Sequence, residues 1–151
     1  RAVSDPHYRY KLAFLDRISA AASDWLAEGK KLFLAGDWNV APLDSDVWDM
    51  EVFDDGLYVS DPERAAFNAF GSAGLREVTR DADGADYTFW DYQQLRFPRN
   101  EGMRIDFAWA APTVADRVET AHIDRNERKG KGASDHVPVV VDIADLTPQS
   151  R

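Results

Sequence analysis

Residues 32–39 read Leu-Phe-Leu-Ala-Gly-Asp-Trp-Asn, a short apolar run that ends at a glycine and is followed by polar side chains. An unbroken apolar run of this length is typical of a strand buried on both faces, so we expect residues 32–35 to form one. Asp37 and Asn39 are two residues apart, and such residues point the same way in an extended segment. The sequence predicts either a carboxylate and a carboxamide that face one ligand, or a turn in which Asp37 accepts hydrogen bonds from loop amides.

Helical and extended patterns surround this strand. Apolar residues recur at spacings of three and four between Tyr8 and Leu26, which predicts an amphipathic helix that stops near Gly29. Asp61-Pro62 is typical of a helix start, with Asp61 as the N-cap, and this second helix should run to Gly74. Strands are expected at residues 75–79, 87–90, 104–110, 118–123 and 137–143, the last with the apolar character of a central strand. This element order indicates one layered α/β domain.

The composition is that of a single acidic domain. The chain has 151 residues, of which 44% are hydrophobic, with no Cys and a formal net charge of −9. The absence of Cys excludes disulfides and thiolate metal sites and fits a cytoplasmic protein. No apolar run approaches the roughly 20 residues that cross a bilayer, so we expect no membrane partner. The acidic balance argues against a nucleic-acid binder with a broad basic surface.

Two further polar clusters lie beside apolar strands. Asp106 interrupts the apolar run at 104–110, and Ser134-Asp135-His136 precedes the run at 137–141. Asp106 could be an ordinary polar position of an edge strand, and a lone His is usually structural. However, an imidazole that is held by a carboxylate keeps one tautomer and a stabilised charged form. Such a pair could bind or protonate an oxyanion, while other carboxylates hold a divalent cation or deprotonate water.

The other histidines and a run of acidic residues are interpreted as structural. His7 and His122 stand apart from acidic clusters in the sequence. The acidic run lacks the spacing and the central Gly of a calcium loop, so we expect a solvated loop there. Its members are Asp44, Asp46, Asp49, Glu51, Asp54 and Asp55.

Four motifs, taken in order, carry a resemblance to a known family. They are Gly36-Asp37-Trp38-Asn39, Tyr87-Thr88-Phe89-Trp90-Asp91-Tyr92, Gly102-Met103-Arg104-Ile105-Asp106 and Ser134-Asp135-His136. Each is weak alone, but together they resemble exodeoxyribonuclease III and the related abasic-site endonucleases of the exonuclease–endonuclease–phosphatase superfamily. The resemblance implies a four-layer α/β sandwich of the DNase I type. This chain, a single domain over residues 1–151, is expected to be its C-terminal part: mainly one sheet with flanking helices, without the N-terminal half.

The resemblance also implies a role for each matching residue. Asp37 would activate or orient the attacking water, and Asn39 would hold a phosphate oxygen. His136 would contact the scissile phosphate with Asp106 as its carboxylate partner. Asp135, with Asp37, would lie at the site of Mg²⁺, with Mn²⁺ as an alternative metal. The residues expected to contact the substrate are Phe89, Trp90, Met103, Arg104 and Ile105.

The implied function is a DNA repair nuclease that hydrolyses phosphodiesters at abasic sites and 3′ ends of duplex DNA. In the resemblance, the principal Glu ligand of the metal belongs to the N-terminal half, which has no counterpart here. A second interpretation is therefore an inactive fragment that associates with its missing half or another protein, because an open apolar sheet face invites association. A third is a superfamily phosphatase on a small phosphorylated substrate. The positive residues expected to meet DNA, unless the last four form only a solvated loop, are Arg96, Arg99, Arg104, Arg125, Arg128, Lys129 and Lys131.

Overall fold

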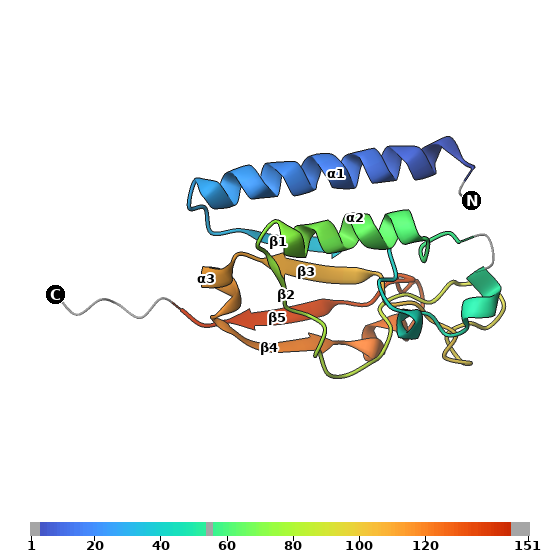
Figure 1. Cartoon of the computed structure of the whole chain (residues 1–151). Helices are drawn as coiled ribbons and strands as arrows, with labels where there is room; N and C mark the ends of the chain where they lie inside the picture. The colour runs from blue at the N-terminus through green and yellow to red at the C-terminus, as the bar shows by residue number, and fades with distance from the viewer. Residues whose placement is uncertain (1–3, 54–55, 146–151) are drawn as a thin grey trace.

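The computed structural model describes residues 4–53 and 56–145; Asp54, Asp55 and the tail from Thr147 onward lie outside these ranges. The two longer helices, α1 and α2, lie along one side of the molecule, a first sheet lies beneath them and a second sheet lies on the far side (Figure 1). Short 3-10 helices connect some of these elements. The helices and strands are α1 Pro6–Ala27, β1 Phe33–Asp37, α2 Asp61–Ser72, β2 Arg76–Glu77, β3 Asp106–Ala110, α3 Pro112–Ala115, β4 Val118–Ile123 and β5 Val139–Ile143.

Helix α1 forms where the apolar spacing predicts it. Asp5 caps its first turn by accepting a hydrogen bond from the backbone N–H of His7 at 2.8 Å, and Pro6 occupies the first helical position. The helix ends at Ala27, two residues before Gly29, whose φ of 74° is left-handed and therefore suits glycine. Leu15 and Ala22 are its buried residues, so the amphipathic prediction is confirmed.

Helix α2 is capped one residue earlier than expected. The N-cap is Ser60 and not Asp61, because the Ser60 and Glu63 side chains each bond the other's backbone N–H in a capping box. The helix ends at Ser72, slightly before the predicted Gly74. Phe67 and Phe70 lie on its apolar side and pack against the first sheet. These contacts set the spacing between α2 and the sheet.

The first sheet has the order β1-β3-β2, with both pairs antiparallel. The expectation that β1 is buried on both faces is wrong: four of its five residues are exposed, including Phe33. The reason is that β1 is an edge strand, and β3 is the one strand that pairs with it in the described part of the chain. Its pairing with β3 is continuous from Phe33 opposite Ala110 to Asp37 opposite Asp106. The hydrogen-bonded ladder therefore fixes the position of the last residue of β1, although the strand lies at an edge.

The second sheet consists of β4 and β5, paired antiparallel. The prediction of a central strand at 137–143 is therefore wrong, because β5 has one strand neighbour and its exposure alternates between half-buried and exposed. The segment 87–90 also differs from expectation. It forms isolated bridges, Phe89 with Met103 and Phe89 with His136, in place of a strand. These bridges tie the loops of the second and third motifs to the loop that carries His136.

The main core lies between the helices and the first sheet. Trp38, Phe67, Phe70, Phe107 and Trp109 pack through ring contacts at centroid distances of 4.8–6.1 Å, which favours a rigid support for the strand ends. The α/β class with helices flanking one sheet is confirmed, and the second sheet adds two strands. Among the described residues, no helix has both the length and the apolar character that a membrane span requires.

Candidate active site

The first, third and fourth motifs meet at the ends of β1 and β3. Asp37 is the last residue of β1 and Asp106 the first of β3, and the antiparallel register sets them directly opposite each other. The loop before β5 brings His136 to the same point, because Val137 N–H bonds the Thr88 carbonyl at 2.9 Å and Phe89 bridges to His136. Three side chains that are far apart in sequence therefore share one site.

The His136 imidazole lies between two carboxylates. Its Nδ1 is 2.9 Å from Oδ2 of Asp106, and its Nε2 is 3.8 Å from Oδ2 of Asp37. The Phe89 ring packs beside it with a centroid distance of 5.0 Å. The side chains of His136 and Asp37 are both about one-third exposed, at 30% and 35%, so a dissolved ligand can reach them. The bond to Asp106 selects the form in which Nδ1 carries a proton.

The electrostatic environment favours the charged imidazole. The hydrogen bond that Nδ1 of His136 donates to Asp106 raises the pKa of His136 above its ordinary value, and the negative charges of Asp106, Asp37 and Asp135 add to this against the opposing effect of burial. An imidazolium has two N–H donors, one directed at Asp106 and one on the side of Asp37. This arrangement can stabilise a negative charge that develops on a bound ligand.

Asp37 is held by Asn39. The backbone N–H of Asn39 bonds Oδ1 of Asp37 at 2.8 Å, and the Asn39 side-chain amide bonds Oδ2 at 2.9 Å. The turn predicted as one of two alternatives is therefore observed, with Asn39 in the left-handed region at a φ of 51°. Burial, followed by the charge of Asp106, raises the pKa of Asp37 despite the bonds from Asn39. A raised pKa improves the match of a carboxylate to proton transfer near neutral pH.

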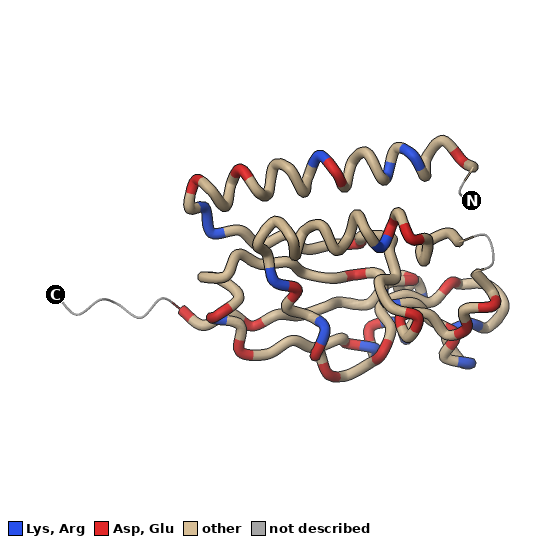
Figure 2. The backbone as a smooth tube through the Cα atoms, viewed as in Figure 1, with Lys and Arg blue, Asp and Glu red and all other residues tan. Residues whose placement is uncertain are grey.

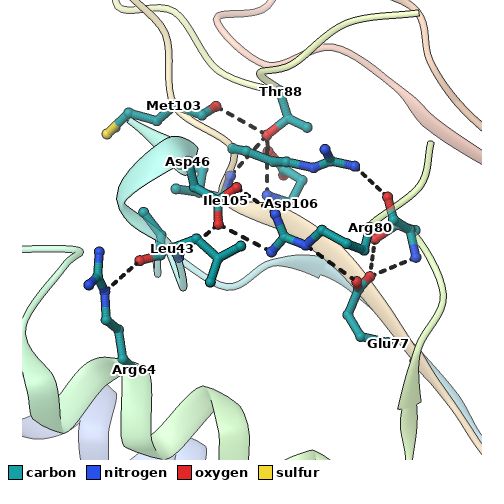
Figure 3. Close-up of polar contacts among 12 residues, drawn as sticks. Leu43, Asp46, Arg64, Glu77, Arg80, Thr88, Met103, Ile105 and Asp106 are labelled. Atoms are coloured by element: carbon teal, nitrogen blue, oxygen red, sulfur yellow. Dashed lines mark hydrogen bonds and ion pairs between the residues drawn. The ribbon is translucent and has the colours of Figure 1, made fainter. Parts of the chain in front are cut away.

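Thr88 is a residue of the site that the sequence analysis missed. Its fully buried hydroxyl donates to Oδ2 of Asp106 at 2.6 Å and accepts from the backbone N–H groups of Ile105 and Asp106 at 3.1 and 3.2 Å (Figure 3). These two donors leave the hydroxyl proton for the carboxylate, so Thr88 orients Asp106 towards His136. The available signal was a lone hydroxyl among the aromatic residues of the second motif.

The residues present do not by themselves fit the metal that the resemblance implies. Asp37 has each carboxylate oxygen bonded by Asn39. Asp135 lies close enough for its charge to raise the pKa of His136, but the described residues contain no group of three His, Asp or Glu side chains arranged to hold a metal ion. Mg²⁺ takes several oxygen ligands in near-octahedral geometry, so further ligands are required from outside this set.

The predicted substrate contacts divide by burial. Phe89 is half-buried beside His136, and it packs on a cluster that contains Met103 and Ile105, both buried. Trp90 is fully buried against Ile123 and Val137. Met103, Ile105 and Trp90 therefore present little or no surface to a ligand in this structure. Met103 and Ile105 form part of the apolar cluster against which the Phe89 ring packs.

Arg104 does not lie where a DNA phosphate could meet it. Its guanidinium is buried, donates to the Thr79 carbonyl and lies 6.0 Å from the Phe107 ring centroid. Burial also lowers the pKa of Arg104. The residue therefore belongs to the interior beneath the site, contrary to the sequence prediction.

Most of the other positive residues expected to meet DNA already form ion pairs or contacts with aromatic rings within the chain. Arg96 and Arg99 both pair with Glu101. Arg125 lies 4.2 Å from the Phe97 ring centroid, and Arg128 lies 4.9 Å from that of Tyr92. Lys and Arg residues are interspersed among the more numerous acidic residues in the helices and loops, and they do not gather on one side of the backbone trace (Figure 2). On the surface of the described residues, the guanidinium groups that DNA could contact are scattered. They do not form the broad basic face that is typical of a nucleic-acid binder.

The acidic run is only partly solvated, which corrects the expectation of a solvated loop. Asp46 is buried, and its carboxylate accepts two bonds from Arg80, at 2.6 and 3.1 Å, and one from the backbone of Leu43 at 2.9 Å (Figure 3). The Asp46 carbonyl also accepts the N–H of Arg104 at 2.7 Å. Asp46 therefore ties the loop after β1 to the segment that leads into β3.

His7 and His122 are each paired with an acidic residue, although neither stands near an acidic cluster in the sequence. His7 bonds the helix-capping Asp5 at 2.8 Å, and His122 bonds Asp83 at 2.5 Å across 39 positions of sequence. Both pairs lie outside the site of His136, so their structural interpretation stands as a prediction.

The fold and the site together define an α/β domain whose paired strand ends present a carboxylate–imidazole–carboxylate group. Comparison with known proteins identifies its family: residues 1–136 match the endonuclease/exonuclease/phosphatase family, and the chain belongs to it. An exodeoxyribonuclease of Bacillus subtilis is 34% identical over 118 residues, which are 76% of this chain and 45% of that protein.

Solved structures agree with the family assignment. A 3′ phosphatase from Neisseria bound to a product DNA hairpin matches 95% of this chain at 30% identity and a TM-score of 0.88, over 56% of its own length. An abasic-site (AP) endonuclease from Archaeoglobus fulgidus matches 94% at 27% identity and a TM-score of 0.82, also over 56% of its length. The chain thus spans about half the length of the relatives it matches.

Proposed function

We propose that this chain supplies the imidazole half of the catalytic site of a DNA repair nuclease that hydrolyses phosphodiesters at abasic sites and 3′ ends of duplex DNA. The observation that carries the proposal is the placement of His136 between Asp106 and Asp37, within 2.9 and 3.8 Å. The relatives named as an exodeoxyribonuclease, a 3′ phosphatase and an AP endonuclease support DNA as the substrate class.

In the proposed chemistry, Asp37 accepts a proton from the water whose oxygen attacks phosphorus. The P–O bond to the leaving sugar oxygen breaks as the new bond forms, and that oxygen takes up a proton from solvent water. The raised pKa of Asp37 suits its role, and the two bonds from Asn39 orient the carboxylate. The His136 imidazolium stabilises the charge that develops on the phosphate oxygens, and Asp106 holds the imidazole in place. The Asn39 amide has a second N–H, which we assign to a phosphate oxygen.

We expect Mg²⁺, or Mn²⁺ in its place, only in the completed protein. The carboxylates described here do not form a group of three suited to a metal, so oxygen ligands from another part of the polypeptide would have to complete the coordination. The proposed roles of Asp37 and His136 do not depend on the identity of that ion.

Cleavage of a duplex with one abasic site tests the proposal. The chain alone is compared with a chimera in which it replaces the matching segment of the B. subtilis relative, each with Mg²⁺ and with EDTA. We expect Mg²⁺-dependent nicking by the chimera and none by the chain alone. A folded chimera that does not cut DNA would contradict the nuclease assignment, and Mg²⁺-dependent nicking by the chain alone would contradict the need for further ligands.

A second candidate function, association as an incomplete module, is favoured by the two faces of β1. A groove of about 820 Å³ lies between α1 and β1, and another of about 360 Å³ lies between the β1–β3 pair and β5. Phe33 lines both grooves and is 38% exposed. An edge strand with apolar surface on both sides is a site for added strands. We infer that the part of the fold outside this sequence occupies these grooves.

Binding of the separate remaining portion of the B. subtilis relative tests this association. We expect a one-to-one complex that Phe33→Asp weakens at least about tenfold, because the variant places a charge in the buried contact. Val140→Asp is the matched control, since Val140 is also exposed but lies on β5 and lines neither groove. Self-association of the chain in place of complex formation would contradict the inference.

A further inference from the structure

Lys11 of α1 reaches the candidate site from outside its four sequence motifs. Its ammonium group donates to the backbone carbonyl of Asn39 at 2.9 Å and pairs with the Glu63 carboxylate of α2. Asn39 is the residue whose two N–H groups hold the carboxylate of Asp37. A continuous chain of polar contacts therefore runs from the two helices to the carboxylate that faces His136.

The Asn39 backbone needs such support. Its φ of 51° places a non-glycine residue in the left-handed region, which costs free energy unless the surroundings hold it there. The N–H of Asn39 is fixed by Asp37, and the carbonyl is fixed by Lys11. With both polar groups of the same residue bonded, the turn that presents the carboxamide is determined on both sides.

Glu63 explains why a lysine can be held at this place. Its side chain has no exposed surface, and it accepts bonds from the backbone N–H and the hydroxyl of Ser60, at 3.2 and 2.7 Å. The Tyr8 hydroxyl lies 2.7 Å from the Ser60 hydroxyl, which adds a second tie between α1 and the start of α2. A capping box alone does not require a carboxylate to be fully buried; the ammonium of Lys11 compensates its charge.

We propose that Lys11 is a positioning residue for Asn39, and through it for Asp37, with Glu63 as the anchor that fixes Lys11. The pair does not touch the reacting groups in the proposed function. It sets the backbone of the turn that carries them. The inference rests on the site of the proposed function, but its test requires neither substrate nor metal. Failure of the nuclease assignment and failure of this inference are therefore distinguishable.

The test is amide hydrogen exchange of Asn39 in the full chain, measured by NMR. Lys11→Met alone would leave a buried unpaired carboxylate and endanger folding. The decisive variant is therefore Lys11→Met with Glu63→Gln, which removes both charges and keeps a capping-box residue at the third helical position. We expect the backbone and side-chain N–H groups of Asn39 to exchange at least about fivefold faster, the factor of one lost hydrogen bond.

Glu63→Gln alone is the matched control. The amide oxygen of the Gln side chain can still accept a hydrogen bond from the Lys11 ammonium, which keeps Lys11 beside the Asn39 carbonyl. The exchange of Asn39 should therefore stay within about twofold of the parent. Exchange in β3, the central and largely buried strand of the first sheet, reports global stability in all variants. Unchanged Asn39 exchange in the folded double variant would overturn the proposal.

A measurement on the unmutated chain covers the case in which the double variant does not fold. Scalar coupling across the hydrogen bond between the Lys11 ammonium nitrogen and the Asn39 carbonyl carbon reports that bond directly. We expect this coupling, together with slow exchange of the ammonium protons, because Lys11 is largely shielded from solvent. Their absence in the folded parent would overturn the proposal as well.

Discussion

The imidazole of His136 touches the carboxylate of Asp106 through Nδ1 at 2.9 Å, while its other nitrogen faces Asp37 at 3.8 Å. Two residues that are paired across β1 and β3 thereby act on one ring from opposite sides. The bonded carboxylate fixes the ring, and the more distant one is left for a ligand or a water molecule. Each part of this arrangement, and each of its supports, can be tested by substitution.

Asp106→Asn should lower the pKa of His136, because the hydrogen bond that the imidazole donates to the Asp106 carboxylate is the largest cause of the raised value. NMR titration of the His136 ring measures the change. Asp135→Asn is the control, and it should lower the pKa less, since Asp135 acts on His136 through charge alone. An equal fall in both variants would contradict the assignment.

The same bond makes stability depend on pH. A histidine whose folded pKa is raised contributes stability that is fully present below its unfolded pKa of about 6.5 and is lost as the pH rises through the folded value. The unfolding free energy of the parent should therefore exceed that of Asp106→Asn by more at pH 5.5 than at pH 8.5. Urea denaturation at the two pH values measures this difference.

Thr88→Val should destabilise the fold by about 1–3 kcal/mol, because it removes a donor to Asp106 and leaves two backbone N–H groups without their acceptor. Thr88→Ser keeps the hydroxyl, so its cost should be less than half as large. Urea denaturation compares the two. Equal losses would mean that the methyl group contributes as much as the hydroxyl, and would contradict a role that rests on the hydrogen bonds of Thr88.

Asp46→Ala should lower the free energy of unfolding by about 3 kcal/mol. The substitution removes the buried carboxylate that accepts hydrogen bonds from the Arg80 guanidinium and the Leu43 N–H. Asp44→Ala is the neighbour in the same acidic run and should change stability by less than about 0.5 kcal/mol, because Asp44 is 72% exposed. Thermal or urea unfolding of both proteins measures the contrast. Similar costs would show that the burial of Asp46 has no energetic consequence.

Gly102→Ala should destabilise the chain by about 1–3 kcal/mol through overpacking. A Cβ at this position would lie 2.6 Å from Nε1 of Trp90 and 2.7 Å from Cδ2 of Tyr87. Gly71→Ala is the control in α2, where the nearest atom would lie at 3.4 Å and the gain in helix propensity is up to about 1 kcal/mol. If Gly102→Ala left the free energy of unfolding unchanged, the side chains of Trp90 and Tyr87 would have to move aside at little cost.

Local signals predicted the helices well. The spacing of Leu15 and Ala22 located the buried side of α1, and the Asp-Pro pair placed α2 to within one residue of its start. The motif order also identified the residues that meet at the end of β1. Helix periods and caps are encoded by neighbouring residues, so one sequence suffices to find them.

The sequence predictions that were wrong share a different cause. Whether a strand or a charged residue is buried depends on partners that are distant in the sequence. Phe33 looks like the core of a central strand, yet β1 is an edge in this chain. Asp46 looks like one of several loop acids, yet Arg80, 34 positions away, makes it an interior residue. Lys11 reaches the site through a contact that no local pattern reveals, and the lone hydroxyl of Thr88 in the second motif gives no sign of its distant partner Asp106.

The most direct test of the proposed site is the effect of His136→Ala on cleavage of an abasic duplex by the chimera with the B. subtilis relative. We expect kcat with Mg²⁺ to fall at least about 100-fold, the lower range for loss of an acid–base or charge-stabilising group, with the fold intact by circular dichroism. His122→Ala, which alters a His–Asp pair outside the site, should leave kcat within about twofold. A His136→Ala chimera that cuts DNA as fast as its parent would contradict the central claim.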